Sequence, residues 1–294
     1  MDKQPLVCCI VLNWNGRDLV LACLASLAQS RYGNALLVVV DNASTDGSVV
    51  AVRAQYPNVK VIENKANLRW AGGNNVGIHY GLEQGADYIL LLNNDTEVEP
   101  DMINWLVRAA EANPGIGLLA PKIYYHAQPD LIWYAGGRAS LWRGLFWHVG
   151  IRQRDRGQFD SPGPVDYITG CAMLIRREVA REVGDIDTAF FLYGEDVDYS
   201  FRVQAAGYGL AMVPEARMWH KVSASWGASS WRKIRARLRS QLTLYRRYAP
   251  PWAWFTTIPL FLLLEGLRVL ALLAAGRLRA LGGKRRPLAA GEKR

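Results

Sequence analysis

Cysteine is scarce in this sequence, which has four among its 294 residues, and their spacing matches no metal-binding pattern. Cys8 and Cys9 stand together in an apolar run, where a thiol serves as a small apolar group in a buried strand. We therefore expect reduced cysteines and a protein of the reducing cytoplasm.

The sequence also lacks a secretory leader at its start. The first residues include Asp2, Lys3 and Pro5, and the apolar run of residues 6–12 ends at Asn13. This stretch is too polar and too short for a signal peptide. We expect nothing to direct this chain out of the cytoplasm.

Acidic residues are nearly absent from the C-terminal part of the chain. Residues 228–294 hold 15 Lys and Arg against 2 Asp and Glu, whereas residues 1–227 hold 20 against 24. The tail also carries Trp252, Trp254 and Phe255 beside a run of leucines. A basic, apolar segment of this kind is typical of a membrane-surface helix. We predict one domain in residues 1–227 and a helical tail in residues 228–294 that contacts an anionic membrane surface rather than nucleic acid.

A long uncharged hydrophobic run is missing even from this tail. Residues 252–264 are apolar or hydroxylic, but Glu265 and Arg268 interrupt before residues 269–275 resume. Two central charges cost about 5 to 7 kcal/mol for insertion, which is as much as the apolar residues return. Basic residues flank both ends, so either orientation conflicts with the positive-inside rule. We expect an anchor in the membrane plane or a re-entrant one; a soluble helical pair packed on the body is the alternative.

Residues 6–92 alternate between two hydrophobic patterns. Continuous apolar runs rich in β-branched residues predict strands, and apolar residues at helical spacing predict helices between them. The strands are expected at residues 6–12, 36–40, 59–62 and 88–92, and the helices at residues 17–30, after residues 44–48, and at residues 73–83. This order predicts an α/β fold with a mostly parallel sheet flanked by helices.

Polar side chains follow each of the four predicted strands. They are Asn13 and Asn15, Asp41 and Asn42, Asn64 and Asn67, and Asn93, Asn94 and Asp95. One such residue after a strand is usually a turn former. Ligands of parallel sheets bind beyond the carboxyl ends of the strands, so four such groups predict a binding crevice.

Three carboxylates crowd the first turn of a predicted helix at residues 195–206. Gly194 can cap this helix, Gly207 can end it, and Asp198 can pair with Arg202 four residues on. Glu195 and Asp196 are then free to face outward. A carboxylate without a neutralising partner can accept a proton in catalysis, although an ordinary acidic helix start would look the same.

The segments around this helix are less regular. Pro100 opens a covering helix over residues 100–112, and residues 121–164, rich in glycine and aromatic residues, predict hairpins and a mobile loop. Residues 165–176 read as a strand broken at Gly170, and residues 210–213 and 216–219 as two short strands. His220 follows at once. With Asp95 it could bind Mn²⁺ or Mg²⁺, but each residue also has an ordinary structural explanation.

Over residues 6–227 the chain resembles the family 2 glycosyltransferases of the GT-A fold, in particular rhamnosyltransferase-like and galactofuranosyltransferase-like members. The order and spacing of several motifs carry the resemblance. They are VLNWNG at residues 11–16, VDNASTDGS at residues 40–48, residues 67–75, LNND at residues 92–95, GCAMLIRR at residues 170–177, the acidic helix start, and HKVS at residues 220–223.

The resemblance implies roles for individual residues. Asn13 and Asp41 would border the nucleoside, with Asp41 bonding a pyrimidine base. Asp95 and His220 would bind the metal, and Asn93 stands where the family usually has the first Asp of an Asp-x-Asp motif. Asp196 would be the general base, with Glu195 the second candidate. The donor-binding residues would be Asn13, Asn15, Asp41, Asn67, Asn74, Asn93 and Asn94.

The function implied is an inverting transfer of one sugar from a nucleoside-diphosphate sugar, with dTDP-L-rhamnose a candidate, to a hydroxyl of a lipid-linked or polysaccharide acceptor in cell-envelope glycan synthesis. The enzyme would act on the inner face of the cell membrane. A processive synthase would bring membrane spans and a Gln-x-x-Arg-Trp motif, which we do not find. A nucleotidyltransferase and a sugar-nucleotide-binding protein without catalysis remain as alternatives.

Overall fold

The computed structural model describes residues 4–142, 145–161, 163, 165–190, 193–222 and 231–255, together with residues 259, 260, 262, 263, 266 and 267. The chain divides into two compact units. The first comprises Met1–Ala139 and Phe146–Leu244, and the second comprises Ser140–Leu145 and Tyr245–Arg294. All the candidate site residues belong to the first unit.

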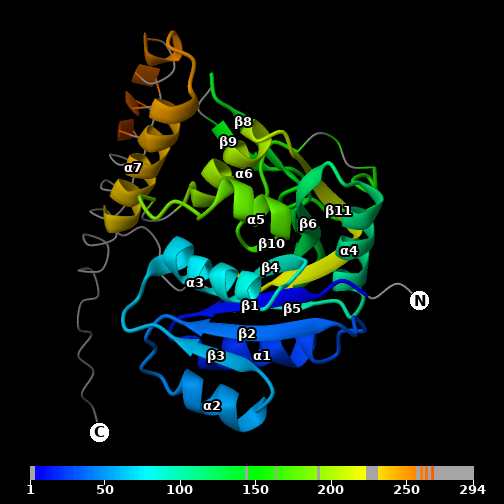
Figure 1. The fold of residues 1–294 in the computed structure, drawn as a ribbon. Coiled ribbons are helices and arrows are strands. Elements are labelled where there is room, and N and C mark those ends of the chain that lie inside the picture. Colours follow the sequence, from blue (N-terminus) through cyan, green and yellow to red (C-terminus); the bar gives the residue numbers. More distant parts are fainter. Residues whose placement is uncertain are drawn as a thin grey trace, which may run out of the picture. The chain divides into compact units, whose positions relative to one another are not determined.

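Four parallel strands form one half of the sheet, in the order β3-β2-β1-β4 (Figure 1). They are β1 (Val7–Asn13), β2 (Ala35–Asp41), β3 (Lys60–Glu63) and β4 (Tyr88–Asn93). The helices between them are α1 (Arg17–Leu27), α2 (Ser48–Gln55) and α3 (Arg69–Glu83). The predicted alternation is confirmed. Helix α3 begins four residues before the predicted residue 73, because the low helix propensity of its first glycines hides the start.

The other half of the sheet is mixed rather than parallel. It continues from β4 in the order β10-β6-β11-β5, with β7 paired to β6. Its strands are β5 (Thr96–Val98), β6 (Ile116–Tyr125), β7 (Gln128–Tyr134), β10 (Ala172–Arg176) and β11 (Gly209–His220). Strand β10 runs antiparallel to both of its neighbours. Strands β6 and β11 pair in parallel, so the prediction of a mostly parallel sheet is confirmed for β1 to β4 and for this pair, while the pairs that involve β5, β7 and β10 are antiparallel.

The two short strands expected around Pro214 are one strand, β11. Its register against β6 shifts between Val213 and Arg217, and this bulge accommodates the proline, which cannot donate a ladder hydrogen bond. The prediction of two strands was wrong because the sequence shows the interruption but not the shared partner.

Helix α6 (Glu195–Ala205) begins as predicted. Gly194 precedes it at φ 95°, a left-handed conformation that favours glycine, and Arg202 Nε donates to Asp198 Oδ2 at 3.0 Å. The C-cap is Ala206, one residue before the predicted Gly207, which follows at φ 93°. The remaining helices of the first unit are α4 (Met102–Ala112), α5 (Arg177–Val183), which the sequence analysis missed, and the first part of α7 (Trp231–Tyr248).

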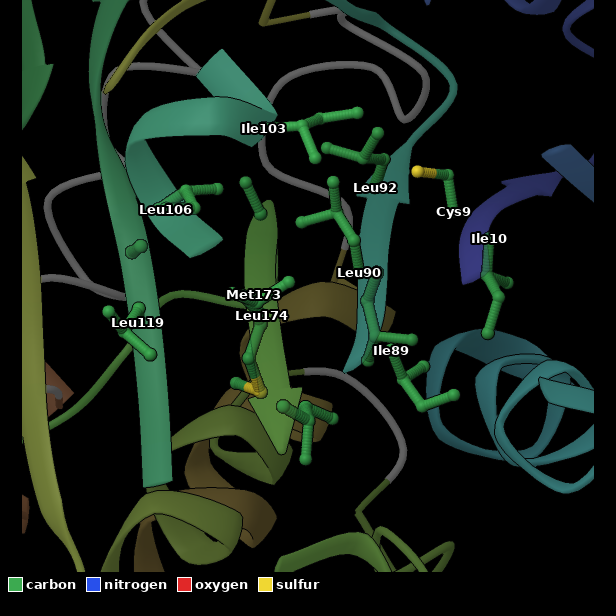
Figure 2. Packing of buried hydrophobic residues seen from close by; sticks show 14 of the residues in the cluster. Cys9, Ile10, Ile89, Leu90, Leu92, Ile103, Leu106, Leu119, Met173 and Leu174 are labelled. Carbon is green, nitrogen blue, oxygen red and sulfur yellow. The ribbon is translucent and has the colours of Figure 1, made fainter. Parts of the chain in front are cut away.

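Apolar side chains from the central strands fill the core of the first unit. Figure 2 shows Ile10, Leu90, Leu92 and Met173 from β1, β4 and β10, all at most 1% exposed. Helix α3 presses a stripe of glycines against this sheet. A Cβ atom added at Gly77 would lie 2.5 Å from Ile10 Cγ2, so the close approach of helix and strand requires glycine there.

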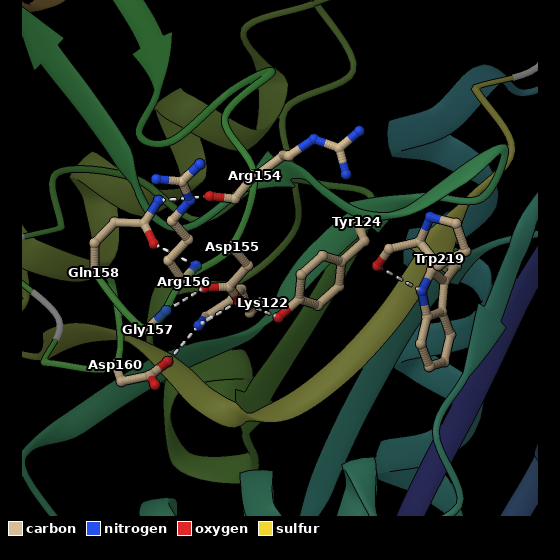
Figure 3. A network of polar contacts seen from close by, with 10 residues as sticks. Lys122, Tyr124, Arg154, Asp155, Arg156, Gly157, Gln158, Asp160 and Trp219 are labelled. Carbon is tan, nitrogen blue, oxygen red and sulfur yellow. Dashed lines mark hydrogen bonds and ion pairs between the residues drawn. The ribbon is translucent and has the colours of Figure 1, made fainter.

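Strands β8 (Gly137–Ser140) and β9 (Leu145–His148) form a separate two-stranded sheet. A buried lysine anchors the loop that follows β9 (Figure 3). Lys122 on β6 is fully buried, and its Nζ contacts Asp155 at 3.0 Å and Asp160 at 2.5 Å. The hydroxyl of Tyr124 donates to Asp155 as well, at 2.5 Å. A buried ammonium ion needs such partners, and here they tie residues 155–160 to the sheet.

The predicted tail lies partly in the first unit, because residues 231–244 of α7 belong to it. In the second unit Trp252, Trp254 and Phe255 are exposed. No helix among the residues that the structure describes has the length and apolar character needed to cross a membrane. The predicted interruption at Glu265 and Arg268 and the run of residues 269–275 lie outside the described residues.

Candidate active site

Three segments that are distant in sequence meet at the turn formed by Gly170 and Cys171. The N–H of Asn93 donates to Cys171 O at 3.1 Å, and the N–H of Gly170 donates to Asp196 Oδ2 at 3.0 Å. Cys171 and His220 lie close enough for each to shift the pKa of the other. The end of β4, the start of α6 and the end of β11 therefore converge, as the sequence analysis expected.

A polar network joins the ends of β1, β2 and β4. Asn13 Nδ2 donates to Asp41 Oδ1 at 2.9 Å, and Asn94 Nδ2 donates to Asn13 Oδ1 at 2.7 Å. Asp41 Oδ2 accepts from the N–H of Ser44 at 2.7 Å. Asn13 and Asp41 are buried, so their geometry is fixed before any ligand binds. Three of the predicted donor-binding residues thus form one network.

The remaining predicted donor-binding residues are spread along the same side of the sheet. Asn15 accepts from Thr45 N at 2.8 Å, and Asn93 accepts from Trp70 Nε1 at 3.1 Å. Asn67 accepts from Arg69 N, whereas Asn74 donates to Trp70 O and buries its Oδ1 without a hydrogen-bond partner. Asn67 and Asn74 therefore lie at the start of α3 rather than in the Asn13 network.

Several loops at this edge contain non-glycine residues with a left-handed backbone. They are Asn15 (φ 48°), Ala43 (φ 59°), Arg69 (φ 64°) and Tyr193 (φ 67°). This conformation costs roughly 1 kcal/mol or more for a residue with a Cβ atom. Its recurrence beside Asn13, Asp41 and Asp196 is typical of a functional rim.

Asp95 and His220 form the pair for which the sequence predicts a metal. His220 Nε2 lies 3.2 Å from Asp95 Oδ1, and both residues are 8% exposed. Burial lowers the pKa of His220, but the neighbouring Cys171 and the contact with the Asp95 carboxylate raise it to about 10. Within the described part of the chain, no group of three or more His, Cys, Asp or Glu side chains could hold a metal ion.

A divalent ion fits this pair as a site with two protein ligands. A carboxylate and an imidazole this close can bind the same ion, which would replace the ring proton. Asn93 adds no carboxylate, because it is an amide, and its amide oxygen already accepts a hydrogen bond from Trp70 Nε1. Further ligands would have to come from water or from a diphosphate.

Glu195 and Asp196 differ in what their oxygens contact. Asp196 accepts backbone hydrogen bonds from Gly170 and from Val197, at 3.0 Å and 2.9 Å. Burial raises its pKa, while these hydrogen bonds pull the other way. Glu195 Oε2 is buried without a hydrogen-bond partner, and burial, followed by the neighbouring Asp196, raises the pKa of Glu195 to about 8. At neutral pH Glu195 thus keeps its proton and Asp196 is the better-supported anion.

Both acids line a cavity of about 630 Å³, which we call the acidic cavity. Its other walls are the side chains or backbone of Phe146, Trp147, His148, Ile151, Tyr167, Tyr193, Gly194, Val197, Ser240, Gln241 and Leu244. The sequence analysis missed the contributions of Ser44, Trp70, Cys171 and His148. Ser44 and Cys171 lie inside quoted motifs, but His148 stands in a segment without a period and gave no signal.

Comparison with known proteins identifies the class. The fold matches the GT-A glycosyltransferase structures. It matches a mannosyltransferase, PcManGT, from Pyrobaculum calidifontis in complex with GDP-Man and Mn²⁺, with a TM-score of 0.58 and 19% identity over 95% of this chain and 81% of that chain. It also matches GalNAc-T7 with UDP, GalNAc and Mn²⁺, with a TM-score of 0.62 and 18% identity over 82% of this chain and 48% of that chain. At such identities these matches show the fold alone.

The sequence gives the family. Residues 8–184 match the model of glycosyl transferase family 2, and the chain belongs to that family. It is 31% identical, over 69% of its length and 72% of the relative's, to an N-acetylglucosaminyl-diphospho-decaprenol L-rhamnosyltransferase of Mycobacterium tuberculosis. The expectation of a family 2 glycosyltransferase of the GT-A fold is confirmed.

Proposed function

We propose that this enzyme transfers L-rhamnose from dTDP-L-rhamnose, with inversion, to a hydroxyl of a lipid-linked diphosphate sugar in cell-envelope glycan synthesis. The observation that carries the proposal is the gathering of three groups at the strand ends: the Asn13–Asp41–Asn94 network, the Asp95–His220 pair, and Asp196, which the turn at Gly170 and Cys171 links to the end of β4. The identity to a rhamnosyltransferase named for a decaprenol-linked acceptor supports the choice of sugar and acceptor.

In this proposal Asp196 is the general base. Its carboxylate takes the proton of the acceptor hydroxyl, whose oxygen attacks the anomeric carbon while the bond from that carbon to the diphosphate oxygen breaks. The nucleoside diphosphate leaves and the anomeric configuration inverts. The two backbone hydrogen bonds to Asp196 support this role, because they fix its orientation and favour its charged form.

Asp41, Asn13 and Asn94 would bind the nucleoside side of the donor, with the other asparagines beside them. Asp95 and His220 would hold a divalent cation, Mn²⁺ or Mg²⁺, which supplies charge neutralisation for the leaving diphosphate. The buried carboxylate–imidazole pair and the lack of a third protein ligand in the described residues agree with a site that the diphosphate completes.

The proposed location is the cytoplasmic face of the membrane. A lipid-linked acceptor remains in the bilayer, and residues 228–294 carry 15 basic against 2 acidic residues. Such a segment is attracted to anionic headgroups.

The test is a transfer assay with dTDP-L-rhamnose and a short-chain N-acetylglucosaminyl diphospholipid, in Mn²⁺, in Mg²⁺ and in excess EDTA. We expect a rhamnosylated lipid whose new linkage has the anomeric configuration opposite to the donor's, with activity lost in EDTA. No transfer from dTDP-L-rhamnose, together with transfer from another nucleoside-diphosphate sugar supplied in its place, would refute the choice of donor, and full turnover in EDTA would refute the metal.

A further inference from the structure

His148 is held in one orientation at the wall of the acidic cavity. Its ring makes edge contacts with Trp133 and Tyr134, with centroids 4.5 Å and 5.0 Å apart, and lies 6.1 Å from Tyr167. The N–H of Ala135 donates to Val149 O, and that of Val149 to Gly136 O, so the backbone after the ring is also fixed. A ring enclosed in this way cannot turn over without disturbing three aromatic neighbours.

The contacts of the ring define where its proton lies. Nδ1 is 3.2 Å from the carbonyl oxygen of Trp133. A carbonyl can only accept, so Nδ1 carries the hydrogen. Burial lowers the pKa of His148 to about 4, and the ring is neutral at physiological pH. Nε2 of a neutral ring protonated on Nδ1 has a lone pair and no hydrogen.

The neighbours of His148 in the cavity complement a polyhydroxylated ligand. Glu195, protonated at neutral pH, can donate, and Gln241 Oε1 is a buried acceptor without a hydrogen-bond partner. Phe146 and Trp147 supply aromatic surface. Buried polar atoms of this kind require a partner, and a sugar offers both hydroxyl donors and an apolar face.

We propose that His148 binds the acceptor sugar, its Nε2 accepting a hydrogen bond from an acceptor hydroxyl other than the one that Asp196 deprotonates. This assignment rests on the proposed function, because it takes the acidic cavity to be the acceptor site. It makes His148 a binding residue for the acceptor with no contact to the donor.

Two substitutions distinguish the roles of the two nitrogen atoms of the ring. His148→Asn keeps an amide donor near the position of Nδ1 for the Trp133 carbonyl but removes the acceptor at Nε2. His148→Gln can place an amide oxygen near the position of Nε2. We expect His148→Asn to raise the KM for the short-chain N-acetylglucosaminyl diphospholipid about tenfold, which corresponds to one hydrogen bond, with the KM for dTDP-L-rhamnose unchanged. His148→Gln should restore most of the affinity.

The matched control is His79→Asn, since His79 is exposed on α3 and pairs with Asp185 outside the cavity. It should change neither KM. An unchanged KM for the acceptor in His148→Asn would overturn the proposal. Equal losses of acceptor affinity in the Asn and Gln variants, with equal falls in Tm, would also overturn it and would show that His148 serves only in packing.

Histidine ¹⁵N spectroscopy keeps the two proposals distinguishable. We expect His148 of the full-length enzyme to show a hydrogen-free Nε2 at neutral pH, and that signal to move on addition of N-acetylglucosamine 1-phosphate. If the wild-type enzyme transfers no rhamnose but this signal moves, the proposed function fails and the sugar-binding role of His148 stands. An Nε2 that carries hydrogen, or a signal that does not respond, refutes the role of His148.

Discussion

Two adjacent carboxylates of α6 face the same cavity, yet their surroundings differ: burial raises the pKa of both, and only at Asp196 do backbone hydrogen bonds from Gly170 and Val197 oppose that rise. Asp196 has two backbone donors, and Glu195 has a buried oxygen with none. An acid that retains its proton at neutral pH cannot take one from a substrate, so in our proposal Asp196 is the base and Glu195 is a neutral acid beside it.

We expect Asp196→Asn to lower kcat by a factor on the order of a hundred or more and to leave donor affinity nearly unchanged, because a general base acts in the transition state. Glu195→Gln should cost much less. Steady-state kinetics with both substrates, together with donor binding by calorimetry, measures the two effects. The reverse order of the two variants would assign the base to Glu195.

The raised pKa of Glu195 also predicts a pH dependence of stability. The folded state binds this proton more tightly than the unfolded state does, so the contribution of Glu195 is present in full below its ordinary pKa of 4.5 and is lost as the pH rises through about 8. As the pH rises from 4.5 to about 8, the free energy of unfolding of the wild type should fall relative to that of Glu195→Gln, by up to about 1.4 kcal/mol per pH unit. Urea unfolding of both proteins at pH 5, 7 and 9 checks this. If the difference in free energy of unfolding between the two proteins does not change with pH, Glu195 does not retain its proton at neutral pH.

At the scale of secondary structure, the contact between α3 and β1 depends on glycine. An added methyl group at Gly77 would lie 2.5 Å from Ile10 Cγ2 and 2.9 Å from Cδ1. We expect Gly77→Ala to destabilise the protein by about 1 to 3 kcal/mol, although alanine is the better helix former.

Gly115→Ala is the matched control, because nothing lies within 4 Å of the added atom and the change should be nearly neutral. Denaturant unfolding measures both variants. The double variant Gly77→Ala with Ile10→Ala should lose less free energy of unfolding than the two single variants lose together. Strictly additive losses would show that the added methyl group does not collide with Ile10.

The loop after β9 is a second element that depends on one residue. We expect Lys122→Met to destabilise the protein by about 3 kcal/mol, since it leaves Asp155 partly buried without its cation. Asp160→Asn should cost far less, because the Asp160 side chain is 56% exposed. Chemical denaturation compares the two. Equal losses would mean that the buried ammonium is not what holds the loop.

The sequence predicted the helices and strands whose hydrophobic pattern is visible within their own stretch of residues. Strands β1 to β4 appear as apolar runs and α6 as a capped acidic start, so their order and the gathering of polar residues at the strand ends followed from elementary rules. Strand β11 was mispredicted because its pairing with β6 depends on a partner that is distant in sequence. Helix α5 was missed because its seven residues are too few to show a helical period. His148 was missed for the same reason as β11, since its proton position depends on Trp133 and its burial on three aromatic rings.

At the scale of the whole molecule, the composition of the tail predicts how the enzyme reaches a lipid acceptor. Trp252, Trp254 and Phe255 are exposed, and Phe255 reaches 85% exposure. Exposed aromatic residues beside basic ones favour the membrane interface. The role of residues 228–294 as a membrane-associating tail stays a prediction.

We expect the full-length enzyme to bind vesicles containing phosphatidylglycerol more tightly than vesicles of phosphatidylcholine alone, and high salt to release only part of it. Phe255→Ser with Trp254→Ser should make the remaining binding salt-labile, because electrostatic attraction is screened and apolar insertion is not. Sedimentation with vesicles measures the bound fraction. Complete release of the wild-type enzyme by salt would show that no apolar insertion occurs.

The left-handed residues at the rim of the crevice bear on attempts to improve this enzyme. Ala43, Arg69 and Tyr193 each hold a backbone conformation that is unfavourable for their residue type, next to groups to which we assign a role in the reaction; Asn15 shares this conformation, which asparagine tolerates better. Relaxing the backbone at these positions would raise thermostability at the expense of turnover, because the strain keeps the loops in working geometry. Selection for heat resistance under a requirement for activity should therefore collect its substitutions away from this edge, in the helices and the outer strands.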